Sequence, residues 1–363
     1  MQGSGYKNIG AALVSGLVER GLEVTVFGLG YRGEPHDLPF GICPAHTGQL
    51  PSIVSILPTA PDLEIEAWVV ALDIPVQLNL LRRTDYGGNI PWIGIFPVEG
   101  DPLCATWATR LWGMAERLII SRFGVQEAQT AGLPASHLQV GVDCEFWEPP
   151  TLEERQLLRK ALDLEHKFVV LTVADNQERK NLSAGMEIMG KVVQDLDAVW
   201  CLVTRPESPI GWELQDLAQD YGVNEHYLEW ERGIPHTELR DLYAMADAFL
   251  LPSKAEGLGM PVLEAMAMGV PVVATDACAL HEHLVDGRGF LIEPEYVHRD
   301  PWGNSRRYYI SVESAALTLK EIPGWRASGA LDAMVKEARA YVVARDWGIA
   351  VDALMEAIGN VKA

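Results

Sequence analysis

The residues best suited to chemistry lie in one stretch, between Ala248 and Thr275, where two carboxylates flank a glycine-bearing loop. Glu256 and Glu264 are separated by seven residues, which begin Gly257, Leu258, Gly259, Met260, Pro261, Val262. The proline is well placed as the first residue of a helix, where its missing N–H costs nothing. Backbone N–H groups at such a helix start attract phosphate. A carboxylate in the loop accepts hydrogen bonds from sugar hydroxyls, and one in the first helical turn reaches a ribose.

Both glutamates also have a purely structural interpretation. Glu264 in a first turn complements the helix dipole, and Glu256 in a loop is solvated. The flanking pattern favours a site, because an apolar run, Ala248–Pro252, precedes the loop and another, Val270–Ala274, follows the helix. Open α/β sheets bind ligands at the carboxyl ends of their parallel strands. The sequence therefore predicts a site for a phosphorylated ligand in this loop.

A second cluster, Arg179-Lys180-Asn181, follows the apolar run Phe168–Ala174. Two cations at the carboxyl end of a strand neutralise a diphosphate, and arginine does so with two parallel hydrogen bonds. The alternative is a solvated basic pair. A third segment, Trp230 to Gly233, stands at the end of the run Tyr227–Trp230.

These loops need strands and helices to position them, and the rest of the chain has that alternation. Several of the apolar runs are apolar on both faces, as in a parallel sheet covered by helices. The predicted strands are Glu23–Gly28, Ala67–Leu72, Trp92–Phe96, Leu118–Ser121, Phe168–Ala174, Val199–Thr204, Tyr227–Trp230, Ala248–Pro252 and Val270–Ala274. The chain is therefore predicted to be α/β.

A break at Glu148-Pro149-Pro150 indicates a domain boundary. We predict two Rossmann-like domains, residues 1–147 and 148–345, and a last helix in 346–363 that packs back on the first domain. The 363-residue length fits two domains of ordinary size.

The first domain begins unusually. Gly3-Ser4-Gly5 precedes a predicted helix from about Asn8 to Arg20, as in the turn after a first strand, but only Met1 and Gln2 come before it. We expect either about five apolar residues upstream in the reading frame or a domain that begins differently. Gly3 and Gly5 let a backbone approach a ligand closely, so both are candidate ligand contacts.

Charge and composition limit the partners. The chain has 29 basic and 50 acidic residues, a net charge of −21. That balance argues against non-specific binding to nucleic acid or to anionic membranes, which depends on Lys and Arg. Five cysteines without CxxC spacing indicate reduced thiols. With no apolar run of bilayer-spanning length and no signal-peptide pattern, we expect a cytoplasmic protein, at most peripheral to a membrane.

The string from Asp247 to Thr275 resembles the retaining glycosyltransferases of the family 4 type, within the glycosyl transferases group 1, which have the GT-B fold. These enzymes carry a Glu, seven intervening residues and a Glu, the spacing of Glu256 and Glu264. The resemblance is strong from about Gly141 to Pro294 and loose before that. It implies two Rossmann-like domains facing each other across a cleft, with a nucleotide-sugar donor held by the second.

The resemblance also implies roles for individual residues. Arg179 and Lys180 stabilise the departing nucleotide diphosphate, Glu256 holds the sugar and Glu264 holds the ribose. Donor contacts come from Gly257, Leu258, Gly259, Met260, Pro261, Val262, Glu264 and Trp230. No metal and no cofactor are expected, and the acceptor, a glycan, a lipid or a small molecule, is not identified by the sequence.

Three departures from the family pattern leave an alternative open, and the missing first strand is one of them. Asp175 stands where the family has an Arg, and Glu99, in the loop after Trp92–Phe96, stands where many relatives have a His that contacts the sugar. Glu99 is a candidate for orienting the donor sugar or the acceptor hydroxyl, and equally a plain turn residue. A degenerate protein that binds a nucleotide sugar or glycan without turnover is therefore the second hypothesis. A dinucleotide oxidoreductase is weaker, because Gly3–Gly10 lacks the Gly-x-Gly-x-x-Gly spacing.

Overall fold

The computed structural model describes residues 5–45, 65–81 and 90–362. The chain forms two compact units: unit 1 contains Met1–Gly141 and Arg345–Ala363, and unit 2 contains Val142–Ala344. The sequence placed the divisions at 147/148 and 345/346. Packing explains the earlier division, because Arg345 Nε donates to the Val140 carbonyl (3.2 Å) and a Cβ on Gly141 would lie 2.7 Å from the Trp347 amide. The chain up to Gly141 thus packs on the returning C-terminal segment.

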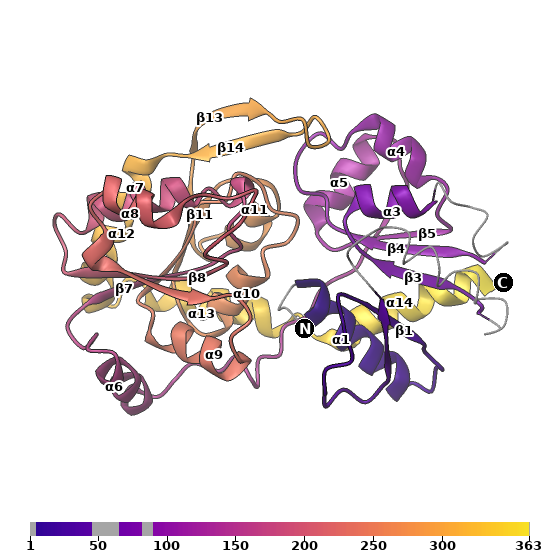
Figure 1. Ribbon diagram of the computed structural model, residues 1–363, viewed down its shortest axis with the longest axis horizontal. Helices are drawn as coiled ribbons and strands as arrows, with labels where there is room; N and C mark the ends of the chain where they lie inside the picture. Colours follow the sequence, from indigo (N-terminus) through magenta and orange to yellow (C-terminus); the bar gives the residue numbers. More distant parts are fainter. Residues whose placement is uncertain (1–4, 46–64, 82–89, 363) are drawn as a thin grey trace. The chain divides into compact units, whose positions relative to one another are not determined.

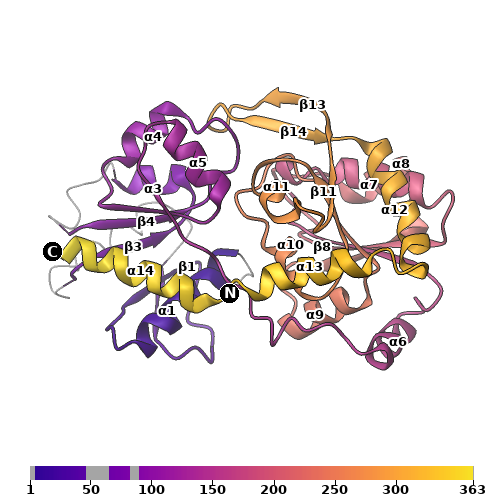
Figure 2. The same ribbon diagram turned by 180° about the vertical axis from the view of Figure 1, so that it is seen from behind.

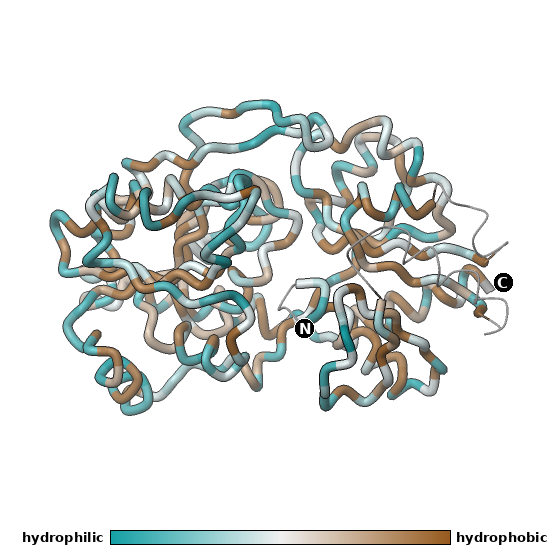
Figure 3. The backbone as a smooth tube through the Cα atoms, viewed as in Figure 1, coloured by the Kyte–Doolittle hydropathy of each residue, from teal (hydrophilic) through white to brown (hydrophobic). Residues whose placement is uncertain are grey.

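Unit 2 is built on a six-stranded parallel sheet in the order β12-β11-β10-β7-β8-β9. Strands β7, β8, β10 and β11 are largely apolar on both faces, and β8 is buried at every position. Figure 3 shows hydrophobic segments at the centre of the unit. The strands are β7 (Phe168–Val173), β8 (Ala198–Thr204), β9 (Tyr227–Glu231), β10 (Ala248–Leu251), β11 (Val272–Thr275) and β12 (Phe290–Ile292). The strand order reverses between β7 and β10. Such sheets bind ligands at the carboxyl ends of the strands that flank this reversal.

Helices cover both faces of this sheet, with α7, α8 and α12 on one side and α9, α10 and α13 on the other (Figure 1). The helices of unit 2 are α6 (Leu152–Ala161), η2 (Glu178–Lys180), α7 (Leu182–Val192), α8 (Leu214–Asp220), η3 (Asn224–His226), α9 (His236–Met245), α10 (Met260–Ala267), α11 (Cys278–Leu284), α12 (Val312–Ala327) and α13 (Asp332–Val343). Helix α6 is fixed by an ion-pair cluster, because Asp247 pairs with Arg155 (2.6 Å) and Arg159 (2.9 Å) just before β10 begins.

The sequence did not predict the antiparallel hairpin of β13 (Pro294–Arg299) and β14 (Arg306–Ile310). The hairpin forms a two-stranded sheet of its own, and its base is closed by Ser311, whose N–H donates to the Glu293 carbonyl (3.4 Å). The short strand β12 was also not predicted, because three residues are too few to show a hydrophobic periodicity.

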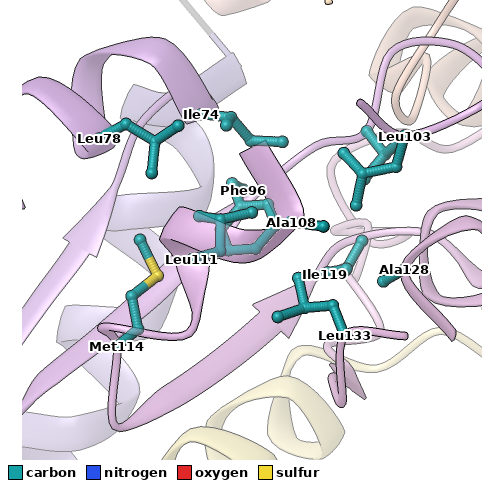
Figure 4. Packing of buried hydrophobic residues seen from close by; sticks show 11 residues of the cluster. Ile74, Leu78, Phe96, Leu103, Ala108, Leu111, Met114, Ile119, Ala128 and Leu133 are labelled. Carbon is teal, nitrogen blue, oxygen red and sulfur yellow. The ribbon is translucent and has the colours of Figure 1, made fainter. Parts of the chain in front are cut away.

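Unit 1 has a four-stranded parallel sheet in the order β3-β4-β5-β6 and a parallel pair, β1 and β2. Its strands are β1 (Val26–Leu29), β2 (Ile42–Ala45), β3 (Trp68–Ala71), β4 (Trp92–Phe96), β5 (Glu116–Ile119) and β6 (Ser136–His137). Its helices are α1 (Gly5–Glu19), α3 (Ile74–Leu81), α4 (Ala105–Leu111), α5 (Arg122–Thr130) and α14 (Trp347–Lys362). Figure 4 shows the apolar core around Phe96 and Leu111.

The C-terminal helix α14 lies against α1 and also contacts β5 of unit 1 (Figure 2). Helix α1 begins at Gly5 rather than near Asn8, so Gly5 is helical and not part of a turn. All nine predicted strands have a counterpart, while β2, β6 and β12 to β14 were not predicted. Among the described residues, no helix is both long and apolar enough to cross a bilayer.

Candidate active site

The loops after β7 and β10 meet at the reversal of strand order in unit 2. Hydrogen bonds of the backbone join them: the Lys254 amide donates to the Arg179 carbonyl (2.9 Å), and the Pro252 carbonyl accepts from Asn181 Nδ2 (3.2 Å). Asn181 adopts the left-handed conformation, with φ of 56°, between η2 and α7. The two loops therefore form one fixed surface at the carboxyl ends of these strands.

Arg179, Lys180 and Glu256 form an ion-paired cluster on this surface. Lys180 Nζ lies 2.5 Å from Glu256 Oε1, and Arg179 Nη1 lies 3.1 Å from Glu256 Oε2. Arg179 Nη1 also donates to the Ala255 carbonyl (2.7 Å). All three side chains are more than four-fifths buried. The cluster carries one net positive charge, held in a fixed geometry by its carboxylate.

The cluster keeps Glu256 ionised. Burial raises the pKa of this carboxyl, but the charges of Lys180 and Arg179 outweigh it and hold the pKa at about 2, below the ordinary 4.5. Glu256 therefore accepts hydrogen bonds at every physiological pH. Its oxygens here pair with the two cations, an arrangement the sequence did not reveal. The predicted role of Glu256 toward a sugar stays a prediction.

The glycine loop leads into α10 as the spacing predicted, with two corrections. Gly259 is the N-cap, with φ of 84°, and Pro261 is the second helical residue rather than the first. The Val262 amide donates to the Gly259 carbonyl (2.9 Å), and proline has no N–H. Of the amides predicted to bind an anion at the helix start, those of Gly259 and Met260 therefore remain as candidates. Leu258 is buried, and its carbonyl lies 2.9 Å from His283 Nε2.

Glu264 lies in the second turn of α10, not the first, so it does not act on the helix dipole as expected. Its side chain is buried, and Tyr243 Oη donates to its Oε2 (2.9 Å). Burial raises the pKa of Glu264 to about 7, against the smaller lowering effect of this hydrogen bond. Near neutral pH the carboxyl is therefore partly protonated. Its contact with a ribose stays a prediction.

Three of the remaining predicted residues can be assigned to elements of the fold. Trp230 is within β9, paired in register with Val203 of β8. Glu99 belongs to unit 1, in the loop after β4. A Cβ added to Gly5 would meet no atom within 4 Å, so no close approach requires glycine there. Gly3 lies outside the described residues.

Lys254 was missed, although it stands inside the motif. Its side chain is 4% exposed, its amino group pairs with Glu178, and it lies 4.5 Å from the centre of the Tyr309 ring. The Tyr308 amide donates to the Lys254 carbonyl (2.8 Å), so β14 of the hairpin is tied to the loop after β10. A lysine between Ser253 and Ala255 in a predicted site was the only available signal.

One segment of the chain is similar to a known protein family. Residues 154–299 match the family model of glycosyl transferases group 1. The GDP-mannose-dependent α-(1-6)-phosphatidylinositol monomannoside mannosyltransferase of Mycolicibacterium smegmatis is 33% identical over 180 residues. That match covers 46% of this chain and 44% of the relative, less than half of either protein. The predicted relationship to group 1 is thus confirmed for this segment, which contains the Arg179–Lys180–Glu256 cluster.

Solved structures resemble the chain along nearly its whole length. Anabaena HepE in complex with UDP and glucose has a TM-score of 0.74 at 16% identity, covering 98% of this chain and 96% of that one. WaaG, a glycosyltransferase involved in lipopolysaccharide biosynthesis, has a TM-score of 0.70 at 15% identity, covering 99% and 97%. Likeness at this identity shows the fold alone. The predicted fold class, α/β of the GT-B type, is confirmed.

Proposed function

We propose that the protein is a retaining glycosyltransferase that moves a sugar from a nucleoside-diphosphate donor to an acceptor hydroxyl. The observation that carries the proposal is the Arg179–Lys180–Glu256 cluster at the carboxyl ends of β7 and β10. Buried cations held in place before the ligand arrives stabilise developing negative charge without reorganising. The match of residues 154–299 to glycosyl transferases group 1 supports the same chemistry.

In this mechanism Lys180 and Arg179 stabilise the negative charge that develops on the leaving diphosphate. Glu256 holds both cations at 2.5 and 3.1 Å and stays ionised. When the diphosphate binds, the cations gain a second anionic partner, and Glu256 keeps lone pairs for a hydroxyl of the transferred sugar. Retention of the anomeric configuration then follows from attack on the same face as the departing phosphate. We propose that these cations suffice and that no metal is required.

The donor is a nucleotide sugar in this proposal. One relative is named as GDP-mannose-dependent, and one structural neighbour holds UDP and glucose, so GDP-mannose and UDP-glucose are the first donors to test. The name of that relative includes phosphatidylinositol monomannoside, and the structural neighbour WaaG is a glycosyltransferase involved in lipopolysaccharide biosynthesis. A glycan or glycolipid acceptor, with at most peripheral membrane contact, is therefore our first choice.

The test is release of nucleoside diphosphate from each donor, with and without EDTA, followed by the anomeric configuration of the product. In Lys180→Ala, kcat should fall about 100- to 1000-fold, with a smaller loss of donor affinity. Lys180→Arg should rescue only in part, because a planar guanidinium does not reproduce a compact ammonium. Lys336→Ala, an exposed position on α13, is the matched control.

Asp175 favours one competing function, a protein that binds nucleotide sugars without turnover, because it replaces a cation that the family resemblance expects. Tight binding of UDP or GDP without any release of diphosphate from the sugar nucleotides would support that alternative. Turnover that survives unchanged in Lys180→Ala would contradict the catalytic assignment.

A further inference from the structure

Three charged residues form a row at the carboxyl ends of β7, β8 and β9. The strands pair in register, with Val173 beside Val203 and Val203 beside Trp230. Two residues further along, the same register brings Asp175, Arg205 and Arg232 side by side. The row lies at the same edge of the sheet as the Arg179–Lys180–Glu256 cluster, because β7 and β10 are neighbouring strands.

Asp175 binds both arginines. Its Oδ2 lies 2.7 Å from Arg205 Nη2 and 2.8 Å from Arg232 Nη1, and Arg205 Nε donates to its Oδ1 (3.2 Å). Gln177 Nε2 also donates to Oδ2 (2.9 Å). The Asp175 side chain is 9% exposed, whereas those of Arg205 and Arg232 are 41% and 27% exposed. The carboxylate is thus buried beneath two arginines that reach solvent.

The surrounding backbone makes this a built arrangement. Asn176 is fully buried and holds the loop after β8, accepting from the Trp212 amide (2.8 Å) and donating to the Trp212 carbonyl (2.8 Å). The Arg232 amide donates to the Thr204 carbonyl (2.6 Å). Two arginines on neighbouring strands would repel each other, so Asp175 is what allows both to point toward one place.

We propose that Arg205 and Arg232, positioned by Asp175, form an anion subsite that binds a phosphate oxygen of the donor. The proposal rests on the proposed function and adds residues to it. An arginine has five N–H donors, and Arg205 directs two nitrogens at Asp175, which leaves its other edge for an oxyanion. The row and the Arg179–Lys180–Glu256 cluster each carry one net positive charge, in a chain whose net charge is −21. Together they match the two negative charges of a diphosphate diester.

The test is calorimetric binding of a probe series: inorganic pyrophosphate, UDP and GDP, and the nucleosides uridine and guanosine. In Arg205→Gln, the affinities for pyrophosphate, UDP and GDP should each fall about 10- to 100-fold. That is the usual range for loss of a charge-assisted hydrogen bond. Nucleoside affinity should not change. Arg299→Gln, on the exposed strand β13, is the control.

Asp175→Asn distinguishes a positioning role of Asp175 from a simple charge effect, because the two predict opposite changes in diphosphate affinity. The substitution makes the site more positive, so simple attraction predicts tighter diphosphate binding. If Asp175 positions the arginines, binding weakens instead, because they repel each other and lose their shared anchor. Weaker binding with an unchanged urea midpoint, recovered in part by Asp175→Glu, supports the proposal. Tighter binding in Asp175→Asn overturns the positioning role.

Other outcomes decide between this proposal and the function it rests on. Unchanged pyrophosphate and diphosphate affinity in Arg205→Gln overturns the subsite but leaves the transferase proposal standing. An equal loss of nucleoside affinity also overturns it, because Arg205 would then contact the base. Absence of sugar transfer in the unmodified protein contradicts the proposed function, and pyrophosphate binding still decides the subsite.

Discussion

Replacement of Glu264 by Gln should remove a pH dependence from the stability of unit 2. The Glu264 carboxyl is buried against Tyr243, whose hydroxyl donates to it at 2.9 Å. Burial raises its pKa from the ordinary 4.5 to about 7. A folded-state pKa above the unfolded one means that folding favours the protonated form. The resulting stability is present below pH 4.5 and is lost as the pH rises through 7.

The size of the effect follows from the same values. A change of one in the pKa corresponds to a free energy of about 1.4 kcal/mol. The rise of the Glu264 pKa from 4.5 to about 7 therefore corresponds to about 3 kcal/mol. Gln has nearly the same shape, keeps an acceptor for Tyr243 and does not ionise. Glu264→Gln should therefore match the unmodified protein near pH 4.5 and exceed its free energy of unfolding by up to about 3 kcal/mol at pH 8.

Urea unfolding at pH 5, 6, 7 and 8 tests this reasoning. The difference between the two proteins isolates Glu264, since all histidines are common to both. Glu337→Gln, an exposed carboxylate on α13, is the control and should run parallel to the unmodified protein. Tyr243→Phe removes the hydrogen bond that lowers the Glu264 pKa, so the loss of stability should move to higher pH. Parallel curves for Glu264→Gln and the unmodified protein between pH 5 and 8 would refute the argument.

Three further outcomes are expected, each measurable by urea unfolding. Gly259→Ala should cost about 1–2 kcal/mol, because φ of 84° is strained for any Cβ-bearing residue, whereas Gly324→Ala, inside α12 with open space around it, should stabilise by about 0.5–1 kcal/mol. Asp247→Ala should cost about 3–5 kcal/mol, since it leaves Arg159 buried without its carboxylate; a loss below 1 kcal/mol would contradict this. Glu256, with a pKa depressed to about 2, contributes stability that is present above pH 4.5 and lost as the pH falls toward 2. Glu256→Gln should therefore lose about 3 kcal/mol at pH 7 and approach the unmodified protein in acid.

The sequence alone determined nine of the strands, several of the helices between them and the loops that carry chemistry. These features are local: a strand buried on both faces reads as a short apolar run, as β7 and β10 do. Their carboxyl ends lie on one edge of any parallel sheet, so Arg179, Lys180 and Glu256 were placed at the same edge from spacing alone.

Tertiary structure alone decided which of these groups touch. Lys180 and Glu256 are 76 residues apart, and they meet because β10 returns beside β7, which no local period encodes. The burial of Glu264 against Tyr243 depends on how α9 packs against α10. The row of Asp175 with two arginines depends on the register of three strands. Hydrophobic periodicity depends on neighbours along the chain, whereas ion pairs and pKa values depend on neighbours in space. The order of the strands in the sheet decides which distant residues become neighbours in space.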